Sequence, residues 1–180
     1  MPNYGGGWKM DSEQMVQKAY ACLLSHDFAN AEKWFELAIE GDPENASLHY
    51  KLSVTYARNN KLQKALWHAK LAVQYNTEEQ LYLAHLQHLE ARRLIVQAEG
   101  YFDGTTESLY MVIYLLRHAV NLDPLAIQGY LLLGEAYAGL EDYDQAIKFV
   151  KEAIKLDPLD DYAILELERY KLKLEQYLKQ

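Results

Sequence analysis

The chain of 180 residues carries 26 acidic and 18 basic side chains, a formal net charge of -8, and half of its residues are apolar. This apolar content excludes a disordered chain, and the acidic balance argues against a nucleic-acid partner, whose phosphates call for a basic surface. The single cysteine, Cys22, excludes an internal disulfide bond. The first residues lack the apolar core of a signal peptide, and the apolar run 109–116 is too short to span a bilayer. We therefore expect a cytoplasmic protein without membrane insertion.

The N-terminal part of the chain predicts a lead-in followed by two helical hairpins. Residues 1–10 are expected to be flexible, because the three glycines at 5–7 cost backbone entropy to order. Over about 12–45, small and apolar residues recur at helical spacing in two segments, and Pro43 ends the second. The segment 46–79 repeats this plan, with Asn45 placed to cap its first helix.

The third segment, 80–126, departs from this plan. Ala72 and Ala119 occupy equivalent positions but lie 47 residues apart, which is 13 more than the 34-residue step between the other hairpins. The capping-box pattern at 77–80 predicts a long helix to about Ala98, then a loop and a helix over 107–122. That last helix is apolar on more than one face, which predicts burial between neighbours. The alternative is that one face meets a partner or a second copy.

The clearest hairpin lies at 127–160, where Asp157-Pro158 closes the unit because proline cannot continue a helix. The same closing frame occurs 34 residues earlier, at 119–124. One hairpin cannot bury its apolar face alone, so the copies are expected to stack. A final helix over 161–178 would cover the last hairpin with its apolar stripe, while Glu166 would face water.

The packing positions of the last hairpin are Gly134, Tyr137, Ala146, Ala153 and Pro158. This pattern resembles the tetratricopeptide repeat family, whose helix-turn-helix unit has the same length. The resemblance implies an all-α fold, a right-handed α-solenoid of four repeats with a C-terminal capping helix, in a single domain over 11–180. The repeats would lie at about 12–45, 46–79, 80–126 with the 13-residue insertion, and 127–160, and the capping helix at 161–178.

In tetratricopeptide repeat proteins the first helix of each repeat lines a concave groove that holds a peptide. By repeat position, the resemblance implies that this groove contains Tyr20, Leu24, Tyr50, Lys51, Val54, Arg58, His85, His88, Arg92, Leu131 and Glu135. The 34-residue step sets Lys51 beside His85 and Arg58 beside Arg92, which predicts a basic strip in an acidic protein. Arginine binds carboxylates in bidentate geometry and tyrosines supply rigid anchors, so we expect an acidic peptide with apolar anchors. The alternative is that these charges are solvated or paired with Glu90 or Glu135.

Motifs for catalysis or metal binding are weak. The sequence contains no glycine-rich phosphate loop, no paired-cysteine metal pattern and no nucleophile elbow. His85 and His88 lie three apart on a helix, as two metal ligands could, but no third ligand accompanies them. Cys22 and His26 lie one turn apart, but Cys22 occupies a packing position of the repeat. We expect no catalytic residue, no metal and no cofactor.

The resemblance, together with these residue patterns, implies a non-catalytic protein-protein interaction module that binds a peptide segment in the concave groove. A small secretion-type chaperone of this repeat family is one alternative. A self-assembling structural scaffold is another, and it would make the protein a homo-oligomer through the third repeat or through Leu165 and Leu172 of the final helix. An enzyme is the class that the sequence favours least.

Overall fold

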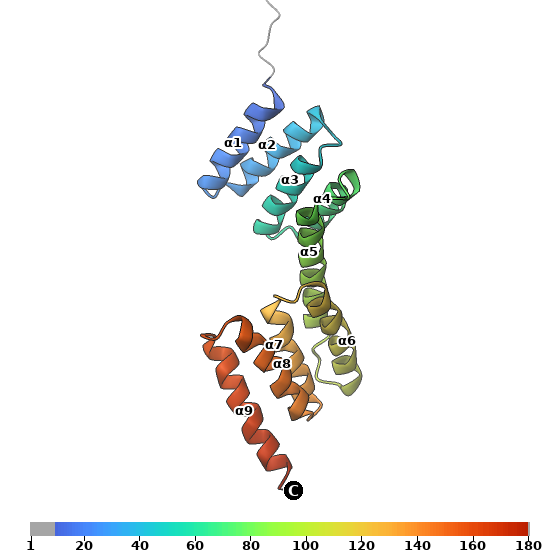
Figure 1. Ribbon diagram of the computed structural model, residues 1–180, viewed down its shortest axis with the longest axis vertical. Helices are drawn as coiled ribbons and strands as arrows, with labels where there is room; N and C mark the ends of the chain where they lie inside the picture. Colours follow the sequence, from blue (N-terminus) through green and yellow to red (C-terminus); the bar gives the residue numbers. More distant parts are fainter. Residues whose placement is uncertain (1–9, 180) are drawn as a thin grey trace, which may run out of the picture. The chain divides into compact units, whose positions relative to one another are not determined.

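The computed structural model describes residues 10–179, so the predicted flexible lead-in lies outside the described residues except for Met10. The described part of the chain contains helices joined by short turns and no strand, which confirms the all-α class (Figure 1). The helices are α1 (Ser12–Leu24), α2 (Phe28–Gly41), α3 (Ala46–Arg58), α4 (Leu62–Tyr75), α5 (Gln80–Glu99), α6 (Thr106–Leu122), α7 (Ile127–Gly139), α8 (Tyr143–Leu156) and α9 (Asp161–Tyr177).

The residues pack as two compact units, divided after Leu89 within α5. Unit 1 comprises the described residues up to Leu89, and unit 2 runs from Glu90 onwards. The sequence predicted one domain over 11–180. Each unit is built from helical hairpins, with α1 against α2 and α3 against α4 in unit 1, and α7 against α8 in unit 2.

Capping side chains determine where the helices of each hairpin begin, and tight turns reverse the chain between them. In unit 1, the Asp27 and Asn45 side chains accept hydrogen bonds from the backbone N–H groups of Asn30 and Leu48, which satisfies the first turns of α2 and α3. The turns of the three hairpins place His26, Asn60 and Glu141 at φ angles of 59°, 56° and 60°. These left-handed conformations reverse the chain in a few residues, so successive helices can lie antiparallel.

The core of unit 1 uses alanines to bring its helices close together. The alanines at the predicted packing positions have no exposed surface, and Phe35, Leu52 and Tyr56 fill the space between the hairpins. Small side chains allow close approach of helix backbones, and large ones then fill the layer between them. The buried alanines are Ala19, Ala31, Ala38, Ala65 and Ala72.

The core of unit 2 joins the second half of α5 to α6, α7 and α8. Gly134 of α7 lies so close to α8 that an added Cβ would approach Val150 Cγ2 to 2.6 Å. The final helix α9 then covers α8, because Ala163 and Tyr170 pack against Ala146 and Val150. The predicted capping role of the C-terminal helix is therefore observed within unit 2.

The expectation that Glu166 faces water is wrong. Its side chain is buried, and its Oε2 atom lies 2.5 Å from Nη2 of Arg169, the residue one turn further along α9. Arg169 also donates a hydrogen bond to the hydroxyl of the buried Tyr170. An ion pair of this kind offsets the cost of burying the carboxylate, which a helical pattern in the sequence does not reveal.

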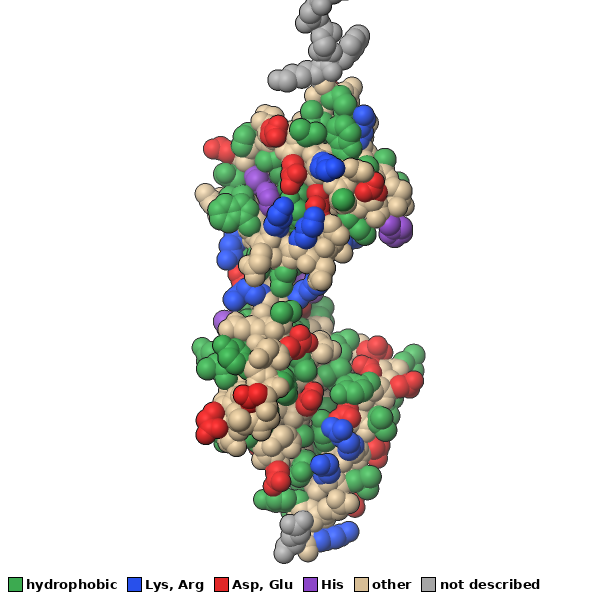
Figure 2. Space-filling view, turned by 180° about the vertical axis from the view of Figure 1, so that it is seen from behind, with side chains coloured by type: hydrophobic (Ala, Val, Ile, Leu, Met, Phe, Trp, Pro, Cys, Tyr) green, Lys and Arg blue, Asp and Glu red, His purple; other side chains and the backbone are tan. Residues whose placement is uncertain are grey.

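Within residues 10–179, no helix is both long enough and apolar enough to cross a membrane. Both units retain apolar side chains on their surfaces, and the space-filling view shows them interspersed with charged groups (Figure 2).

Candidate functional site

A cleft between α1 and α3 of unit 1 gathers several of the residues predicted for the groove. It has a volume of about 170 Å³. Five of the predicted groove residues line it, together with three residues that the sequence did not single out. The predicted residues are Tyr20, Tyr50, Lys51, Val54 and Arg58, and the additional ones are Leu23, Phe35 and Thr55.

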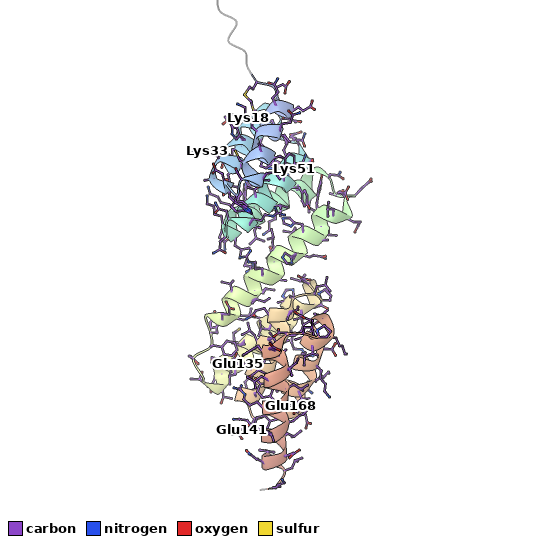
Figure 3. The ribbon with its side chains drawn as sticks, turned by 90° about the vertical axis from the view of Figure 1, so that its left-hand side faces the viewer. Lys18, Lys33, Lys51, Glu135, Glu141 and Glu168 are labelled. Carbon is purple, nitrogen blue, oxygen red and sulfur yellow. The ribbon has the colours of Figure 1, made fainter. Side chains whose placement is uncertain are left out.

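Helical spacing explains how α3 contributes to this cleft. Lys51, Val54 and Arg58 are separated by three and four residues, so they share one face of the helix. Figure 3 labels Lys51 on this helix, within unit 1. Arg58 is exposed at the end of α3, where a cation also interacts favourably with the helix dipole.

Aromatic contacts hold the α1 side of the cleft. The Tyr20 ring meets the Phe35 ring edge to face, with 5.8 Å between centroids, and Phe35 is completely buried beneath it. The Lys51 ammonium group lies 6.0 Å from the centroid of the Tyr20 ring. This cation–π geometry places a positive charge over an apolar wall, so the cleft combines an apolar floor with a cationic rim.

His85 contacts Tyr50 and Ser53 of α3 and is not one of the residues that line the cleft. Its ring meets Tyr50 edge to face at 5.2 Å, and Tyr50 in turn stacks on Tyr82. The Ser53 hydroxyl donates to the Ala65 carbonyl at 2.7 Å, so Nε2 of His85, 2.8 Å away, is the donor to Ser53 Oγ. Burial, and secondarily the nearby His88, lower the pKa of His85 to about 4. A half-buried imidazole with a lowered pKa is neutral at pH 7, so His85 adds no positive charge beside Lys51.

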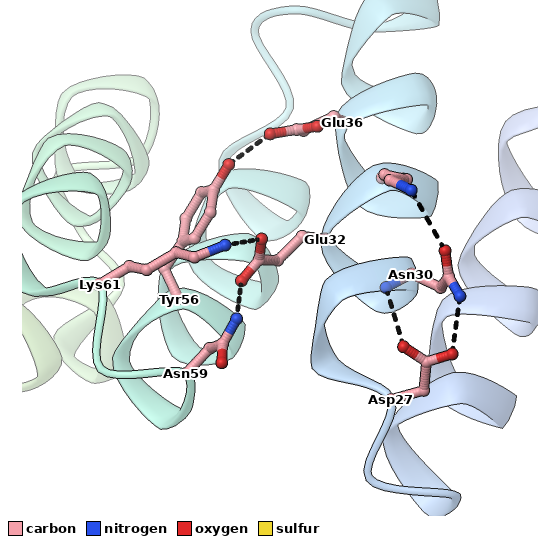
Figure 4. A network of polar contacts seen from close by, with 8 residues as sticks. Asp27, Asn30, Glu32, Glu36, Tyr56, Asn59 and Lys61 are labelled. Carbon is pink, nitrogen blue, oxygen red and sulfur yellow. Dashed lines mark hydrogen bonds and ion pairs between the residues drawn. The ribbon is translucent and has the colours of Figure 1, made fainter.

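A buried polar network fixes the turn that follows Arg58 (Figure 4). Glu32 of α2 accepts hydrogen bonds from Asn59 Nδ2 at 2.7 Å and from Lys61 Nζ at 2.6 Å. The Tyr56 hydroxyl donates to Glu36, and burial followed by this carboxylate raises the pKa of Tyr56, so the phenol remains protonated. These contacts bind the α3–α4 turn to α2 and thereby position the cationic end of α3.

The charge distribution of the sequence singles out the second hairpin. Between residues 45 and 77 the chain has no aspartate or glutamate, although the whole protein has 26. The same segment carries five basic residues, Lys51, Arg58, Lys61, Lys64 and Lys70. The cleft therefore belongs to a locally cationic part of an acidic protein, which favours an anionic ligand.

The remaining predicted groove residues do not line this cleft. Leu24 is exposed at the end of α1, and His88 is exposed on α5. Arg92, Leu131 and Glu135 belong to unit 2, where Leu131 packs partly into the core between α8 and α9 and Glu135 is exposed (Figure 3).

Three lining residues were missed for identifiable reasons. Phe35 and Thr55 are buried, and their position beneath the cleft depends on how α1, α2 and α3 pack. Leu23 lies next to the expected Leu24, and a shift of one residue turns a helical side chain by roughly 100°. Periodicity alone could have located the helix face but not this rotation.

The described residues give no support for a metal centre. Among residues 10–179, no group of three or more His, Cys, Asp or Glu side chains could hold a metal ion. Cys22 is half-buried in α1 and has a free thiol.

Comparisons with known proteins identify one repeat of the chain and its fold. A model of the tetratricopeptide repeat family matches residues 127–158. Solved structures share the fold. MamA from Desulfovibrio magneticus is 15% identical, with a TM-score of 0.56 over 96% of this chain and 94% of that chain. A tetratricopeptide repeat protein from Parabacteroides merdae is 16% identical, with a TM-score of 0.53 over 93% of this chain and 75% of that chain. YrrB, described as a tetratricopeptide repeat protein with an unusual peptide-binding site, is 16% identical with a TM-score of 0.51 over 88% and 92%. No curated protein matches the sequence significantly.

The family model identifies a tetratricopeptide repeat at residues 127–158, and the solved structures share the fold of the chain, which agrees with the resemblance seen in the sequence. Proteins with this fold generally mediate protein-protein interactions. At these identities the likeness to the solved structures concerns the fold alone.

Proposed function

We propose that this protein is a non-catalytic interaction module and that the α1–α3 cleft of unit 1 binds an acidic peptide segment of a partner protein. The observation that carries the proposal is the coincidence of the cleft with the acid-free segment 45–77. YrrB, which has a similar fold, is described as having a peptide-binding site, and this supports peptide binding as a use of such a surface.

The apolar part of the cleft provides a pocket for one apolar side chain of the peptide, which acts as its anchor. Leu23, Val54 and the rings of Tyr20 and Phe35 line it, and the volume of about 170 Å³ suits one leucine or one aromatic side chain. Tyrosine rings give large contact area with few rotatable bonds, so little entropy is lost on binding.

The cationic rim supplies the preference for acidic residues. Arg58 can form a two-pronged hydrogen bond with a carboxylate, whereas Lys51 acts as a point charge above Tyr20. An acidic residue close to the apolar anchor would therefore meet the rim while the anchor fills the cleft. Several negative charges on the partner segment would also increase its rate of association with the cationic α1–α3 cleft at low salt.

Affinity capture from the native lysate tests this proposal. Wild type is compared with Arg58→Glu, and with Lys33→Glu as a matched control that reverses an exposed charge on α2 outside the cleft. A partner retained by wild type and Lys33→Glu, but lost by Arg58→Glu, supports the cleft. Equal capture by all three proteins rejects it.

Because Arg58 stabilises the end of α3, the variant must be shown to be folded. Circular dichroism checks helical content, and Arg58→Gln provides a second variant without a new charge at the helix C-terminus. The captured partner is then digested, and its bound segment is expected to contain aspartate or glutamate next to an apolar residue.

Self-assembly is a second candidate, because α9 leaves apolar side chains on its outer face. Ile164, Leu165 and Leu172 are exposed there, with 65% of the surface of Leu165 accessible. A sedimentation measurement tests this candidate. A monomer at all concentrations rejects it, whereas an oligomer that dissociates in the double variant Leu165→Glu, Leu172→Glu supports it.

A further inference from the structure

Unit 2 contains a second cleft, formed by α6 and α8, that the proposed function does not use. Its volume is about 720 Å³. Five of its lining residues come from α6 and one from α8: Tyr114, Arg117, His118, Val120, Asn121 and Phe149. None of the groove residues implied by the family resemblance lines this cleft.

The wall of this cleft is held in place by contacts to α7. Phe149 stacks on Tyr137, with 5.4 Å between centroids and an interplanar angle of 11°. The Tyr137 hydroxyl accepts a hydrogen bond from Arg117 Nη1 at 3.2 Å. This bond uses one of the five N–H groups of the guanidinium and orients it at the cleft, so less entropy is lost when a ligand binds to it.

The charges around the cleft favour an anion. Unit 2 carries sixteen acidic and ten basic side chains, yet no lining residue of the cleft is acidic. Arg117, His118 and Asn121 all present N–H donors, and an arginine fork matches the geometry of a carboxylate. A carboxylate would therefore find donors here, whereas the acidic excess of the rest of unit 2 would repel it.

An exposed apolar stripe along α6 continues from the cleft. Tyr110 and Tyr114 lie one helical turn apart and retain 62% and 68% of their surfaces, and Met111 is exposed beside them. Aromatic side chains next to an arginine are the residue types that dominate binding energy at protein interfaces. Isolated exposed apolar residues are ordinary, but these three occupy adjacent positions on one helix and lead to a cationic cleft.

We infer that the α6–α8 cleft is a second peptide-docking site, distinct from the α1–α3 cleft. Its occupant is a partner segment in which an aspartate or glutamate lies close to an aromatic or leucine side chain. The carboxylate bonds to Arg117, and the apolar side chain packs on Tyr114 and Phe149. Charge complementarity between an acid-free cleft and an acidic segment selects this occupant over a neutral or basic one.

A selection from displayed random peptides tests the inference. Peptides are selected on wild-type protein and counter-selected on Arg117→Glu. The surviving sequences are expected to be enriched in Asp or Glu near Phe, Trp, Tyr or Leu. A synthetic copy of a selected peptide should bind wild type at least about tenfold more tightly than it binds Arg117→Glu or Tyr114→Ala. The first change removes the partner of the peptide carboxylate, and the second removes the ring on which its apolar side chain packs.

Two further variants separate this site from its alternatives. Lys179→Glu makes the same charge change elsewhere in unit 2 and should bind like wild type, and Arg58→Glu should also bind normally because it alters only the α1–α3 cleft. If Arg117→Glu loses helical content, Arg117→Gln replaces it. Peptides without acidic residues, peptides that ignore both Arg117 and Tyr114, or peptides lost on Arg58→Glu would each overturn the inference.

Discussion

The Lys61 ammonium group lies 2.6 Å from the Glu32 carboxylate, which retains only 7% of its side-chain surface. Asn59 donates a second hydrogen bond to the same carboxylate, so the α3–α4 turn is bound to α2 at two points. A buried carboxylate without these donors is costly, because it has lost its water as well. The position of Arg58, one residue before Asn59, therefore depends on Glu32.

Replacement of Glu32 by glutamine should destabilise unit 1 by about 1–3 kcal/mol, because the charge-assisted hydrogen bonds to Lys61 and Asn59 are lost or weakened. Urea unfolding followed by tryptophan fluorescence measures this effect selectively, since tryptophans occur only at positions 8, 34 and 67, all before unit 2. Glu40→Gln, at an exposed position of α2, serves as the control and should leave the midpoint unchanged. An unchanged midpoint for Glu32→Gln would show that the pair contributes nothing.

An alanine at position 134 should destabilise unit 2 by about 1–2 kcal/mol, because its Cβ would overlap Val150, which lies in a packed layer. This cost must exceed the gain of about 1 kcal/mol that alanine brings to a helix. Thermal unfolding by circular dichroism measures the shift. Gly41→Ala, where nothing lies near the added Cβ, should not lower the melting temperature. In a Val150→Ala background the loss at position 134 should largely disappear, and its persistence there would contradict the packing explanation.

Unit 1 should lose stability as the pH falls from about 6.5 towards 4. Burial, and then the proximity of His49, lower the pKa of His68 to about 4, and burial has the same effect on the pKa of His85. Between these pH values the unfolded chain binds more protons than the folded one, so protonation favours unfolding. The loss should be about 1 kcal/mol for each histidine once solvent screening of these partly exposed groups is included.

Urea unfolding at several pH values, read by tryptophan fluorescence, measures this dependence. The double variant His68→Gln, His85→Gln should show a flatter profile between pH 6.5 and 4. His118→Gln lies in unit 2 and should leave the profile unchanged. A wild-type profile that is already flat in this range would mean that folding does not lower the pKa values of these two imidazoles.

The sequence predicted the helices well because each depends on local information. Alanines at a fixed step of 34 residues mark close helix contacts, and Pro43, Pro124 and Pro158 mark positions where a hairpin ends. Both signals can be recognised without knowledge of the packing. The long helix and the loop of the third segment were also apparent from the increased spacing.

Burial of polar side chains could not be predicted in the same way. His85 and Glu166 both lie on helical faces that mix polar and apolar residues, and only the packed structure shows that Ser53 bonds to His85 and that Arg169 forms an ion pair with Glu166. The α1–α3 cleft was partly foreseen, because five of its residues follow from repeat position. Its floor at Phe35 and the α6–α8 cleft depend on contacts between helices that a linear pattern does not contain.

The most direct test of peptide binding at the α1–α3 cleft is a calorimetric titration with the acidic segment mapped from a captured partner. The account predicts that Arg58→Glu weakens binding at least about tenfold, that Lys33→Glu does not, and that exchange of the segment's Asp and Glu for Asn and Gln has the same effect as Arg58→Glu. Affinity should also fall as salt is raised. Binding that is equally strong for Arg58→Glu and for the neutral peptide would contradict the account.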